Sequence, residues 1–359
     1  MRNVFGTFKK CTPVDIHEFY MQRCLDLAIK AIGHVAPNPI VGCVIVHNNQ
    51  IIGEGYHQQY GKAHAEVNAI NSVAAELVYL LTESTIYVSL EPCSHHGKTP
   101  PCADLIISKK IPKVVIASND PNPLVAGKGI KKLLDAGVEV VAGVLKNEAD
   151  FLNRRFMTAH LKHRPYVILK WAESSDGYMA PNEPEQVWLT NDFSKKLVHQ
   201  WRREEQAIMV GKRTVEIDDP ELTVRLIEGR NPARVIIDRS LSLPASKKIF
   251  HDNASVFVYN DLKEQVDGHT HFIQIDFEQP VLQQVLKNMA VKNIQSVIVE
   301  GGPATLQHFI DENLWDEARV FTASVKLGVG KASPKITGKL LKEEWIGDDK
   351  LKYISNTSV

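Results

Sequence analysis

The sequence predicts an α/β protein that folds as two domains, and three observations support this prediction. Short apolar runs typical of buried strands alternate with amphipathic helical stretches along most of the chain. The chain has 359 residues, more than a single hydrophobic core usually supports. A polar and basic stretch without a strand pattern, residues 147–164, separates two such alternating runs. The alternation itself favours a parallel or mixed sheet that is covered by helices on both faces.

These observations set the expected domain boundaries. We expect an N-terminal extension over residues 1–14, a first domain over 15–150, a junction over 151–164 and a second domain over 165–359. The junction closes at Arg164-Pro165, where the polar and basic segment ends.

The first domain begins with a helix and then alternates strands and helices. The run GCVIV followed by IIGEG is typical of a hairpin that turns at Asn48-Asn49. His64 opens the apolar-periodic stretch AEVNAINSVAAEL, which indicates a helix. Pro100-Pro101 favours a first helical turn at Cys102. The remaining expected elements are helices at 17–31 and 127–137 and strands at 85–90, 113–119 and 138–143.

Composition and charge exclude several classes of protein. The 42 basic and 42 acidic side chains cancel, so the chain lacks the basic surface typical of nucleic-acid binding. It contains no run of 18 apolar residues, so we expect no membrane span. Residues 1–15 contain no apolar signal core, and five cysteines, an odd number, suit a reducing compartment. We therefore expect a cytoplasmic protein that binds neither nucleic acid nor membrane.

One histidine and two cysteines occur in an order typical of a catalytic zinc site. His64, Cys93 and Cys102 supply ligands that zinc prefers and leave its fourth position for water. Glu66, two residues after His64, is suitably placed to move protons to and from that water. The expected helix starts at His64 and Cys102 would favour thiolate and anionic water through the helix dipole. This combination indicates hydrolytic removal of an amino group from a nucleobase-like ring.

Other interpretations of these residues stay open. His-x-Glu is also common at the start of an amphipathic helix, and the same ligands could hold a structural zinc. Many zinc deaminases carry Pro-Cys-x-x-Cys, whereas eight residues, SHHGKTPP, separate the two cysteines here. His95 and His96 in this insert could compete as ligands, but three ligands and a water already complete a tetrahedral site. We interpret both histidines as either substrate-facing or solvated.

The second domain repeats the β/α rhythm, and one of its strands ends in a glycine-rich turn. The strand SVIV is followed by Glu300-Gly301-Gly302 and then by a helix. Free backbone N–H groups at such a turn suit a cofactor phosphate, although Gly-Gly alone is only a turn signal. The turn is not the G-x-G-x-x-G fingerprint, which disfavours a Rossmann dinucleotide site. The expected strands cover 166–172, 207–212, 234–238, 255–260, 271–276, 296–302 and 318–324, and the expected helices cover 193–205, 280–292 and 304–313.

Several segments together resemble a known family. Pro37-Asn38-Pro39, Val41-Gly42, His64-Ala65-Glu66, LEPCSHHGKTPPC and NDPNPLVAGKG resemble the bifunctional deaminase/reductase of riboflavin biosynthesis. The long insert between the cysteines is characteristic of that family and separates the chain from cytidine and tRNA adenosine deaminases. LKWAESSDG, VWLTN, WRREEQAIMVGKRTVEIDDPELTVR, VIIDRS and VEGGPATL look like the family's reductase half. The resemblance covers about residues 15–330. It implies an N-terminal cytidine-deaminase-like α/β/α domain and a C-terminal dihydrofolate-reductase-like α/β domain.

The resemblance also implies cofactors and ligand contacts. It implies Zn²⁺ in the first half and NADPH in the second. By position, NADPH would contact Ala172, Trp188, Thr214, Asp218, Ser240, Gly302, Pro303, Ala304, Thr305 and Leu306. The substrate would contact Gln186, Arg202, Leu222, Arg225 and Glu300. The sequence departs from the family pattern at Ser175, where leucine is usual, and at Gln186, where serine is more usual.

The chemistry of these side chains is compatible with such contacts. Arg202 and Arg225 carry forked cations that suit a ribose phosphate, and Glu300 could accept hydrogen bonds from ribose hydroxyls. Without the resemblance, Arg202 would be interpreted as a charge on a helix surface. Hydride transfer is the cofactor's own chemistry, so we expect no dedicated acid/base pair. We interpret His199 and His308 as surface or core residues.

The expected function is therefore two consecutive steps of riboflavin biosynthesis. The first is zinc-dependent hydrolytic deamination of 2,5-diamino-6-(5-phosphoribosylamino)pyrimidin-4(3H)-one. The second is NADPH-dependent reduction of the ribosyl group of 5-amino-6-(5-phosphoribosylamino)uracil to ribityl. We expect the phosphoribosylaminopyrimidine substrate to be the only kind of partner besides the cofactors. We also expect the chain to form a homo-oligomer, either a dimer or a tetramer. One alternative is a zinc deaminase of nucleosides or tRNA with a non-catalytic C-terminal domain for binding or oligomerisation. Another is a zinc-stabilised scaffold without catalysis.

Overall fold

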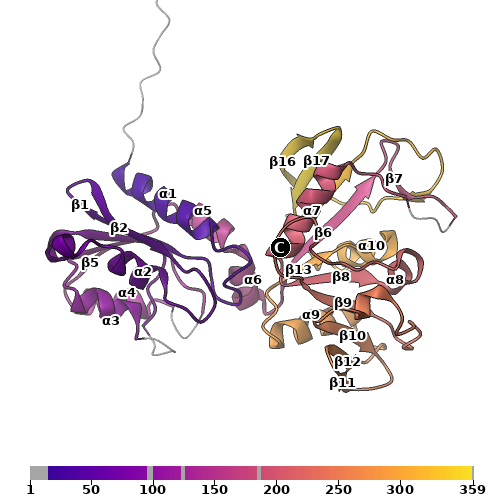
Figure 1. Cartoon of the computed structure of the whole chain (residues 1–359), viewed down its shortest axis with the longest axis horizontal. Helices are drawn as coiled ribbons and strands as arrows, with labels where there is room; N and C mark the ends of the chain where they lie inside the picture. Colours follow the sequence, from indigo (N-terminus) through magenta and orange to yellow (C-terminus); the bar gives the residue numbers. More distant parts are fainter. Residues whose placement is uncertain (1–14, 95–99, 123–125, 184–186, 358–359) are drawn as a thin grey trace, which may run out of the picture. The chain divides into compact units, whose positions relative to one another are not determined.

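The chain folds into two compact units that divide between Asn153 and Arg154 (Figure 1). The computed structural model describes residues 15–94, 100–122, 126–183 and 187–357. Most of the segment expected as a junction is helical: α6 (Arg154–Lys162) belongs to the second unit. None of the helices in the described part of the chain has the length and apolar character needed to cross a membrane.

The first unit is built on a five-stranded mixed sheet with the strand order β2-β1-β3-β4-β5. β1 is antiparallel to β2 and β3, whereas β3, β4 and β5 are parallel. The expected turn is confirmed, because Asn48 and Asn49 have φ values of 47° and 63°, as a two-residue hairpin turn requires. The strands are β1 (Gly42–His47), β2 (Gln50–Tyr56), β3 (Thr85–Leu90), β4 (Lys113–Ser118) and β5 (Glu139–Ala142).

Helices cover both faces of this sheet, as the alternation predicts (Figure 1). Successive residues of β1 point to opposite faces. Val44 and Val46 join the apolar cluster of α1 (Ile16–Ile29) and α5 (Lys146–Leu152). Cys43 and Ile45 join the cluster that contains residues of α2 (Ala65–Asn71), α3 (Cys102–Ser108) and α4 (Lys128–Asp135).

One helix of the first unit is shorter than the expected 65–77. α2 ends at Asn71, and a separate 3₁₀ helix follows at Ala75–Glu83. The hydroxyl of Ser72 donates to the carbonyl of Ala69 (2.8 Å) and accepts from the N–H of Glu54 (2.9 Å). These bonds to the backbone compete with continuation of the helix.

The second unit is built on a ten-stranded sheet with the order β11-β12-β10-β9-β8-β13-β6-β14-β17-β16. Its seven central strands, from β12 to β14, are parallel, and the outer strands are antiparallel. β7 (Tyr178–Ala180) and β15 (Lys331–Ala332) form a separate small sheet. The large sheet contains β6 (Tyr166–Glu173), β8 (Ala207–Gly211), β9 (Ala233–Ile237), β10 (Val256–Asn260), β11 (Gln265–Asp267), β12 (Thr270–Gln274), β13 (Ser296–Val299), β14 (Glu317–Thr322), β16 (Lys339–Ile346) and β17 (Asp349–Ser355).

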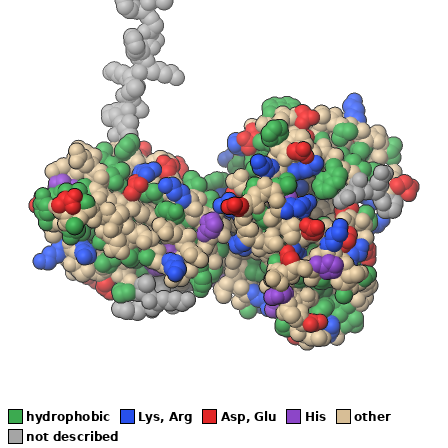
Figure 2. Space-filling view, in the orientation of Figure 1, with side chains coloured by type: hydrophobic (Ala, Val, Ile, Leu, Met, Phe, Trp, Pro, Cys, Tyr) green, Lys and Arg blue, Asp and Glu red, His purple; other side chains and the backbone are tan. Residues whose placement is uncertain are grey.

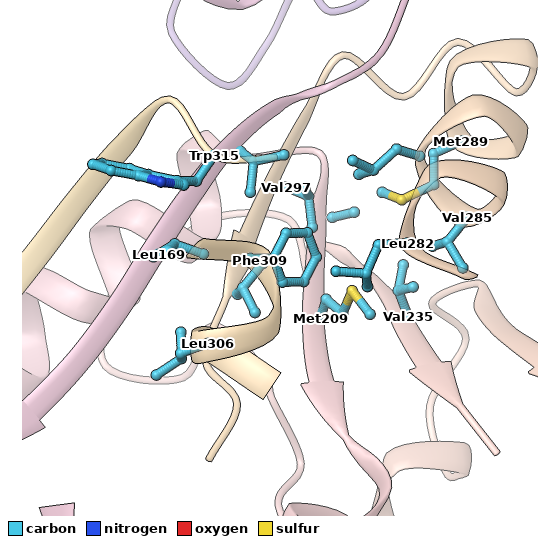
Figure 3. Packing of buried hydrophobic residues seen from close by; sticks show 14 of the residues in the cluster. Leu169, Met209, Val235, Leu282, Val285, Met289, Val297, Leu306, Phe309 and Trp315 are labelled. Carbon is cyan, nitrogen blue, oxygen red and sulfur yellow. The ribbon is translucent and has the colours of Figure 1, made fainter. Parts of the chain in front are cut away.

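Two apolar clusters pack on opposite faces of this sheet. α9 (Val281–Val291) and α10 (Pro303–Asp311) bury Leu282, Met289 and Phe309 against strands β8 and β13 (Figure 3). α7 (Asp192–Glu204) and α8 (Lys212–Asp218) contribute to the cluster on the other face. The expected strand 207–212 stops at Gly211, because Lys212 already begins α8. On the face shown in Figure 2, acidic and basic side chains are interspersed, in keeping with the balanced charge.

The buried amide of Asn153 closes the first unit. Its side chain accepts from the N–H of Ile40 and donates to the carbonyl of Ile40, both at 2.9 Å. We expect Asn153→Ala to lower the free energy of unfolding by about 2–5 kcal/mol, because two buried backbone groups lose their partners. Gln22→Ala, which removes an exposed bond to Asp26, should cost about 0.5 kcal/mol or less. Urea unfolding checks both values, and equal effects would contradict the explanation.

Candidate active sites

The structure brings together the three side chains that the sequence predicts as metal ligands. His64 is the N-cap of α2, Cys93 lies beyond the end of β3, and Cys102 is the first residue of α3. His64 Nδ1 lies 3.6 Å from Cys93 Sγ and 3.4 Å from Cys102 Sγ. All three ligand atoms lie within 4.8 Å of one another. One imidazole and two sulfurs in this arrangement fit a zinc ion with one remaining position.

The charges around the ligands also fit a cation. The backbone N–H of Cys102 donates to Cys93 Sγ at 3.3 Å. Hydrogen bonding from the Cys102 thiol outweighs burial and, together with His64, lowers the pKa of Cys93 to about 4. Hydrogen bonding to Cys93 and burial raise the pKa of Cys102 well above its usual range. A negative charge on one thiol therefore prevents ionisation of the other until a cation compensates both.

Glu66 lies in the first turn of α2, directly beside these ligands in the sequence. Its carboxyl is buried. Burial and the charge of Cys93 raise the pKa of Glu66 to about 7. A carboxyl with a pKa near neutrality can both accept and return a proton.

Glu91 is a functional residue of the first unit that the sequence analysis missed. Its buried carboxylate follows β3 directly, two residues before Cys93. It accepts from the backbone N–H groups of Asp120 (3.3 Å), Gly127 (3.0 Å), Gly129 (3.0 Å) and Ile130 (3.3 Å). These bonds tie Asp120 and the start of α4 to the end of β3, two residues before Cys93. The available signal was a charged residue at the end of a buried strand, immediately before a ligand. His95 and His96 lie outside the described residues.

The second unit contains a cavity of about 580 Å³ between α7 and the carboxyl end of β13. Predicted substrate residues Arg202, Arg225 and Glu300 line it together with the predicted cofactor residue Trp188. Lys170, Lys195 and His199 also line it and were not predicted. Gln186 lies outside the described residues. Leu222 packs in the apolar cluster beneath.

A buried carboxylate and two cations form the polar end of this cavity. Arg202 donates from Nε and Nη2 to the two oxygens of Glu300, both at 2.9 Å, and Lys170 Nζ lies 3.6 Å from Glu300. Burial alone would raise the pKa of Glu300, but the charges of Arg202 and Lys170 lower it to about 2. Arg202 is therefore no surface charge. Its fork is engaged by Glu300 rather than open to a phosphate. A lysine inside the apolar run YVILKWA was the signal for Lys170.

His199 lies on the cavity wall. Its ring is buried, and its Nδ1 accepts from the backbone N–H of Arg225 at 3.1 Å. Burial, with the charges of Arg202 and Arg225, lowers the pKa of His199 to about 4. The ring is thus neutral at physiological pH, with Nδ1 unprotonated. The interpretation of His199 as only a surface or core residue missed its place on the cavity wall, whereas His308 is an exposed residue paired with Glu312 (2.7 Å).

The glycine-rich turn at the start of α10 lies next to the start of α8. Gly302 is the N-cap of α10, and no side chain of the described residues caps that helix. A Cβ added at Gly302 would lie 3.8 Å from the hydroxyl of Thr214 in α8, and one at Gly211 would lie 2.5 Å from that of Thr305. The turn therefore combines N–H groups with two hydroxyls, which fits a cofactor phosphate.

The other predicted cofactor residues are spread around this turn. Ala172 lies in β6 and Ser240 lies in an exposed turn after β9. Asp218 ends α8, and burial raises its pKa. Pro303 and Ala304 begin α10. Leu306 is different, because its side chain is buried in the core cluster and its N–H is donated to the carbonyl of Gly302 (3.2 Å).

The departure at Ser175 is accommodated locally. Its backbone N–H and its hydroxyl both donate to the carbonyl of Val325, at 2.8 Å and 3.1 Å. The side chain is exposed, so the hydroxyl pays no burial cost.

Removal of a single ligand should release the metal. We expect Cys102→Ala to lose both bound zinc and deaminase activity. Only two of the three protein ligands that a catalytic zinc needs would remain. Cys43→Ala, which removes a buried thiol of the same unit outside the ligand set, should keep the metal. Elemental analysis of the purified variants measures the ratio of zinc to protein. A full complement of zinc in Cys102→Ala would contradict the ligand assignment.

The ion pairs of Glu300 should make the second unit sensitive to acid. Since folding lowers the pKa of Glu300 from 4.5 to about 2, its stabilisation is present above about pH 4.5 and is lost as the pH falls toward 2. We expect Glu300→Gln to be less stable at pH 7 and to show a weaker pH dependence in that window. Glu343→Gln, at a surface pair with Lys350, should preserve the dependence. Thermal unfolding across pH measures both, and an unchanged slope in Glu300→Gln would refute this explanation.

Comparison with known proteins gives matches along both units. Residues 165–355 match the family model described as the RibD C-terminal domain. Residues 14–118 match the model of the cytidine and deoxycytidylate deaminase zinc-binding region. The riboflavin biosynthesis protein RibD of Aquifex aeolicus is 40% identical over 324 residues, covering 88% of this chain and 89% of that protein. The RibD protein of Bacillus amyloliquefaciens is 38% identical over 333 residues, covering 90% and 89%.

Solved structures give the same result. The deaminase/reductase of Thermotoga maritima superposes with a TM-score of 0.87 at 37% identity, covering 95% of this chain and 99% of that chain. RibD of Acinetobacter baumannii superposes with a TM-score of 0.89 at 35% identity, with the same coverage. These matches confirm the predicted fold class and the predicted cofactors, Zn²⁺ and NADPH. The chain belongs to the family of bifunctional deaminase/reductase enzymes of riboflavin biosynthesis.

Proposed function

We propose that the first unit deaminates 2,5-diamino-6-(5-phosphoribosylamino)pyrimidin-4(3H)-one and that the second reduces the ribosyl group of the product, 5-amino-6-(5-phosphoribosylamino)uracil, to ribityl. The Thermotoga relative is named for this pair of activities. The observation that carries the proposal is the meeting of His64, Cys93 and Cys102 next to buried Glu66, in a chain whose second unit holds a charged cavity.

In the first unit, His64, Cys93 and Cys102 would hold Zn²⁺. When bound, zinc lowers the pKa of water and so supplies a nucleophile at neutral pH. Glu66 would take a proton from this water and deliver it to the departing amine. Burial of the Glu66 carboxyl favours its protonated form, which suits return of the proton to the amine. Glu91 would act indirectly, by fixing the start of α4 to the strand end that leads to Cys93.

In the second unit, the N–H groups at Gly302 and the hydroxyls of Thr214 and Thr305 would hold phosphate groups of NADPH. The cofactor supplies the hydride. Glu300, held by Arg202 and Lys170, would orient the sugar, because fixed charges at the cavity end define one pose. Arg225 approaches a carboxylate only loosely, with Glu221 at 3.9 Å, and would therefore bind the substrate phosphate.

Location and assembly are part of the same proposal. The buried free thiols of Cys24 and Cys43 suit a reducing compartment, which supports a cytoplasmic enzyme. Edge strand β16 exposes Leu340, Leu341 and Trp345, which supports a homo-oligomer, dimer or tetramer, that covers this strand.

Substitution of the proton carrier tests the deaminase assignment. We expect Glu66→Ala to retain zinc but to lose about 10²–10⁴-fold in the rate of ammonia release, because positioned proton transfer contributes that factor. Reduction of the deaminated substrate should be unaffected, because its site lies in the other unit. Glu76→Ala, at an exposed glutamate of the first unit, should behave as the unsubstituted enzyme.

Two outcomes would contradict the assignment. Unchanged ammonia release in Glu66→Ala would remove Glu66 from the mechanism. Ammonia release from cytidine or tRNA, with none from the diaminopyrimidine phosphate, would favour a nucleoside or tRNA deaminase instead.

A further inference from the structure

The segment 219–226 joins α8 to the region before β9 and carries two predicted substrate residues, Leu222 and Arg225. It contains neither helix nor strand. Asp219 and Leu222 have φ values of 40° and 57°, in the left-handed region that side chains rarely adopt. A backbone in this conformation persists only where its surroundings hold it.

Four side chains from outside the segment bind its backbone. The carbonyls of Glu221 and Thr223 accept from side chains, and the N–H groups of Val224 and Arg225 donate to side chains. The bonds run from Arg234 Nε to the Glu221 carbonyl (2.9 Å), from Arg202 Nη1 to the Thr223 carbonyl (3.4 Å), from Val224 N–H to Asn231 Oδ1 (2.8 Å) and from Arg225 N–H to His199 Nδ1 (3.1 Å). The segment is therefore clamped on both sides of Leu222.

Two of the four side chains are joined to each other through one carboxylate. Arg234, in β9, is completely buried and binds both oxygens of Asp252 through its two terminal nitrogens. Asp252 also accepts from Asn231 Nδ2 and from the N–H of Ala254, both at 2.9 Å. This hydrogen bonding, first that from Arg234, lowers the pKa of Asp252.

Packing alone does not account for a charge at position 234. An apolar side chain could fill the space between sheet and segment without the cost of desolvating a guanidinium. Only a side chain with several donors in a fixed fork can bind Asp252 and the Glu221 carbonyl simultaneously. The bond to the segment therefore gives this arginine a role beyond the core.

We propose that Arg234, Asp252 and Asn231 are positioning residues for substrate binding, which hold the segment 219–226 so that Arg225 faces the cavity. The inference rests on the proposed function of the second unit. The three residues act through the segment and do not line the cavity. Loss of the clamp should therefore weaken substrate binding while hydride transfer and NADPH binding persist.

Asn231→Ala is the mild test and Arg234→Met the severe one. For Asn231→Ala we expect the KM for the deaminated substrate to rise about 3–10-fold, the effect of one lost hydrogen bond. For Arg234→Met we expect a larger rise. In Asn231→Ala, kcat should change by less than about 2-fold, since the groups at the reacting centre are untouched. The dissociation constant for NADPH and the deaminase rate of the same chain should be unchanged.

Hydrogen–deuterium exchange provides a readout that needs no turnover. Peptides covering 219–226 should exchange faster in Asn231→Ala, because the Val224 N–H loses its acceptor. Arg164→Met is the matched control. It removes a bidentate salt bridge between Arg164, just before β6, and Asp316. Both the KM and the exchange of peptides covering 219–226 should be unchanged.

The outcomes separate this inference from the proposed function. An unchanged KM together with unchanged exchange in Asn231→Ala would overturn the clamp. A rise in KM accompanied by an equally large fall in kcat and in NADPH affinity would also overturn it. Such a result would show that the three residues only support the fold in general. If the unsubstituted enzyme fails to reduce the deaminated substrate, the proposed function fails. The exchange measurement then still decides whether the segment is clamped. If Arg234→Met does not fold, Asn231→Ala decides alone.

Discussion

Each unit places a buried glutamate at the carboxyl end of a strand, and both sites depend on how that charge is compensated. Glu91 follows β3 and is compensated by four backbone N–H groups, so its charge ties Asp120 and the start of α4 to the strand end that precedes Cys93. Glu300 follows β13 and is compensated by Arg202 and Lys170, so its charge fixes side chains instead. A buried carboxylate without partners would cost several kcal/mol, about what a whole domain can spare. The partners are therefore necessary to the fold and also shape the sites.

This difference in partners suits the two chemistries. Backbone N–H groups compensate Glu91, so no cationic side chain is needed beside His64, Cys93 and Cys102. Cations around Glu300 leave a cavity with excess positive charge, suited to an anionic, phosphorylated sugar. The phosphate of the cofactor is accommodated separately, at the uncapped start of α10. The way each glutamate is compensated therefore differs between the two units, in keeping with a metal site in one and a site for a phosphorylated sugar in the other.

The sequence could predict the parts of each site that lie close together along the chain. His64 and Glu66 share one helical turn and the two cysteines flank one insert, so their order and spacing revealed them. The substrate role of Glu300 was implied by the family resemblance. Strands of the parallel sheets were predicted because both their faces are buried and apolar. The hairpin of β16 and β17 was missed, since β16 is mostly exposed and charged and shows no buried alternation. Lys170, His199 and Arg234 were missed as site residues because their partners are distant in the sequence. The separations run from 13 positions between Arg234 and Glu221 to 130 positions between Lys170 and Glu300. Leu306 was predicted to contact NADPH from its position in the family motif. That position does not reveal that its side chain is buried in the core.

The most direct test of the account is the order of the two reactions in the zinc-loaded, unsubstituted enzyme. The purified protein would be incubated with 2,5-diamino-6-(5-phosphoribosylamino)pyrimidin-4(3H)-one, with and without NADPH, while ammonia and NADPH are followed together. The account predicts the same rate of ammonia release in both samples, and NADPH oxidation that begins only as deaminated product accumulates. NADPH oxidation without prior ammonia release, or no ammonia release from this substrate, would contradict it.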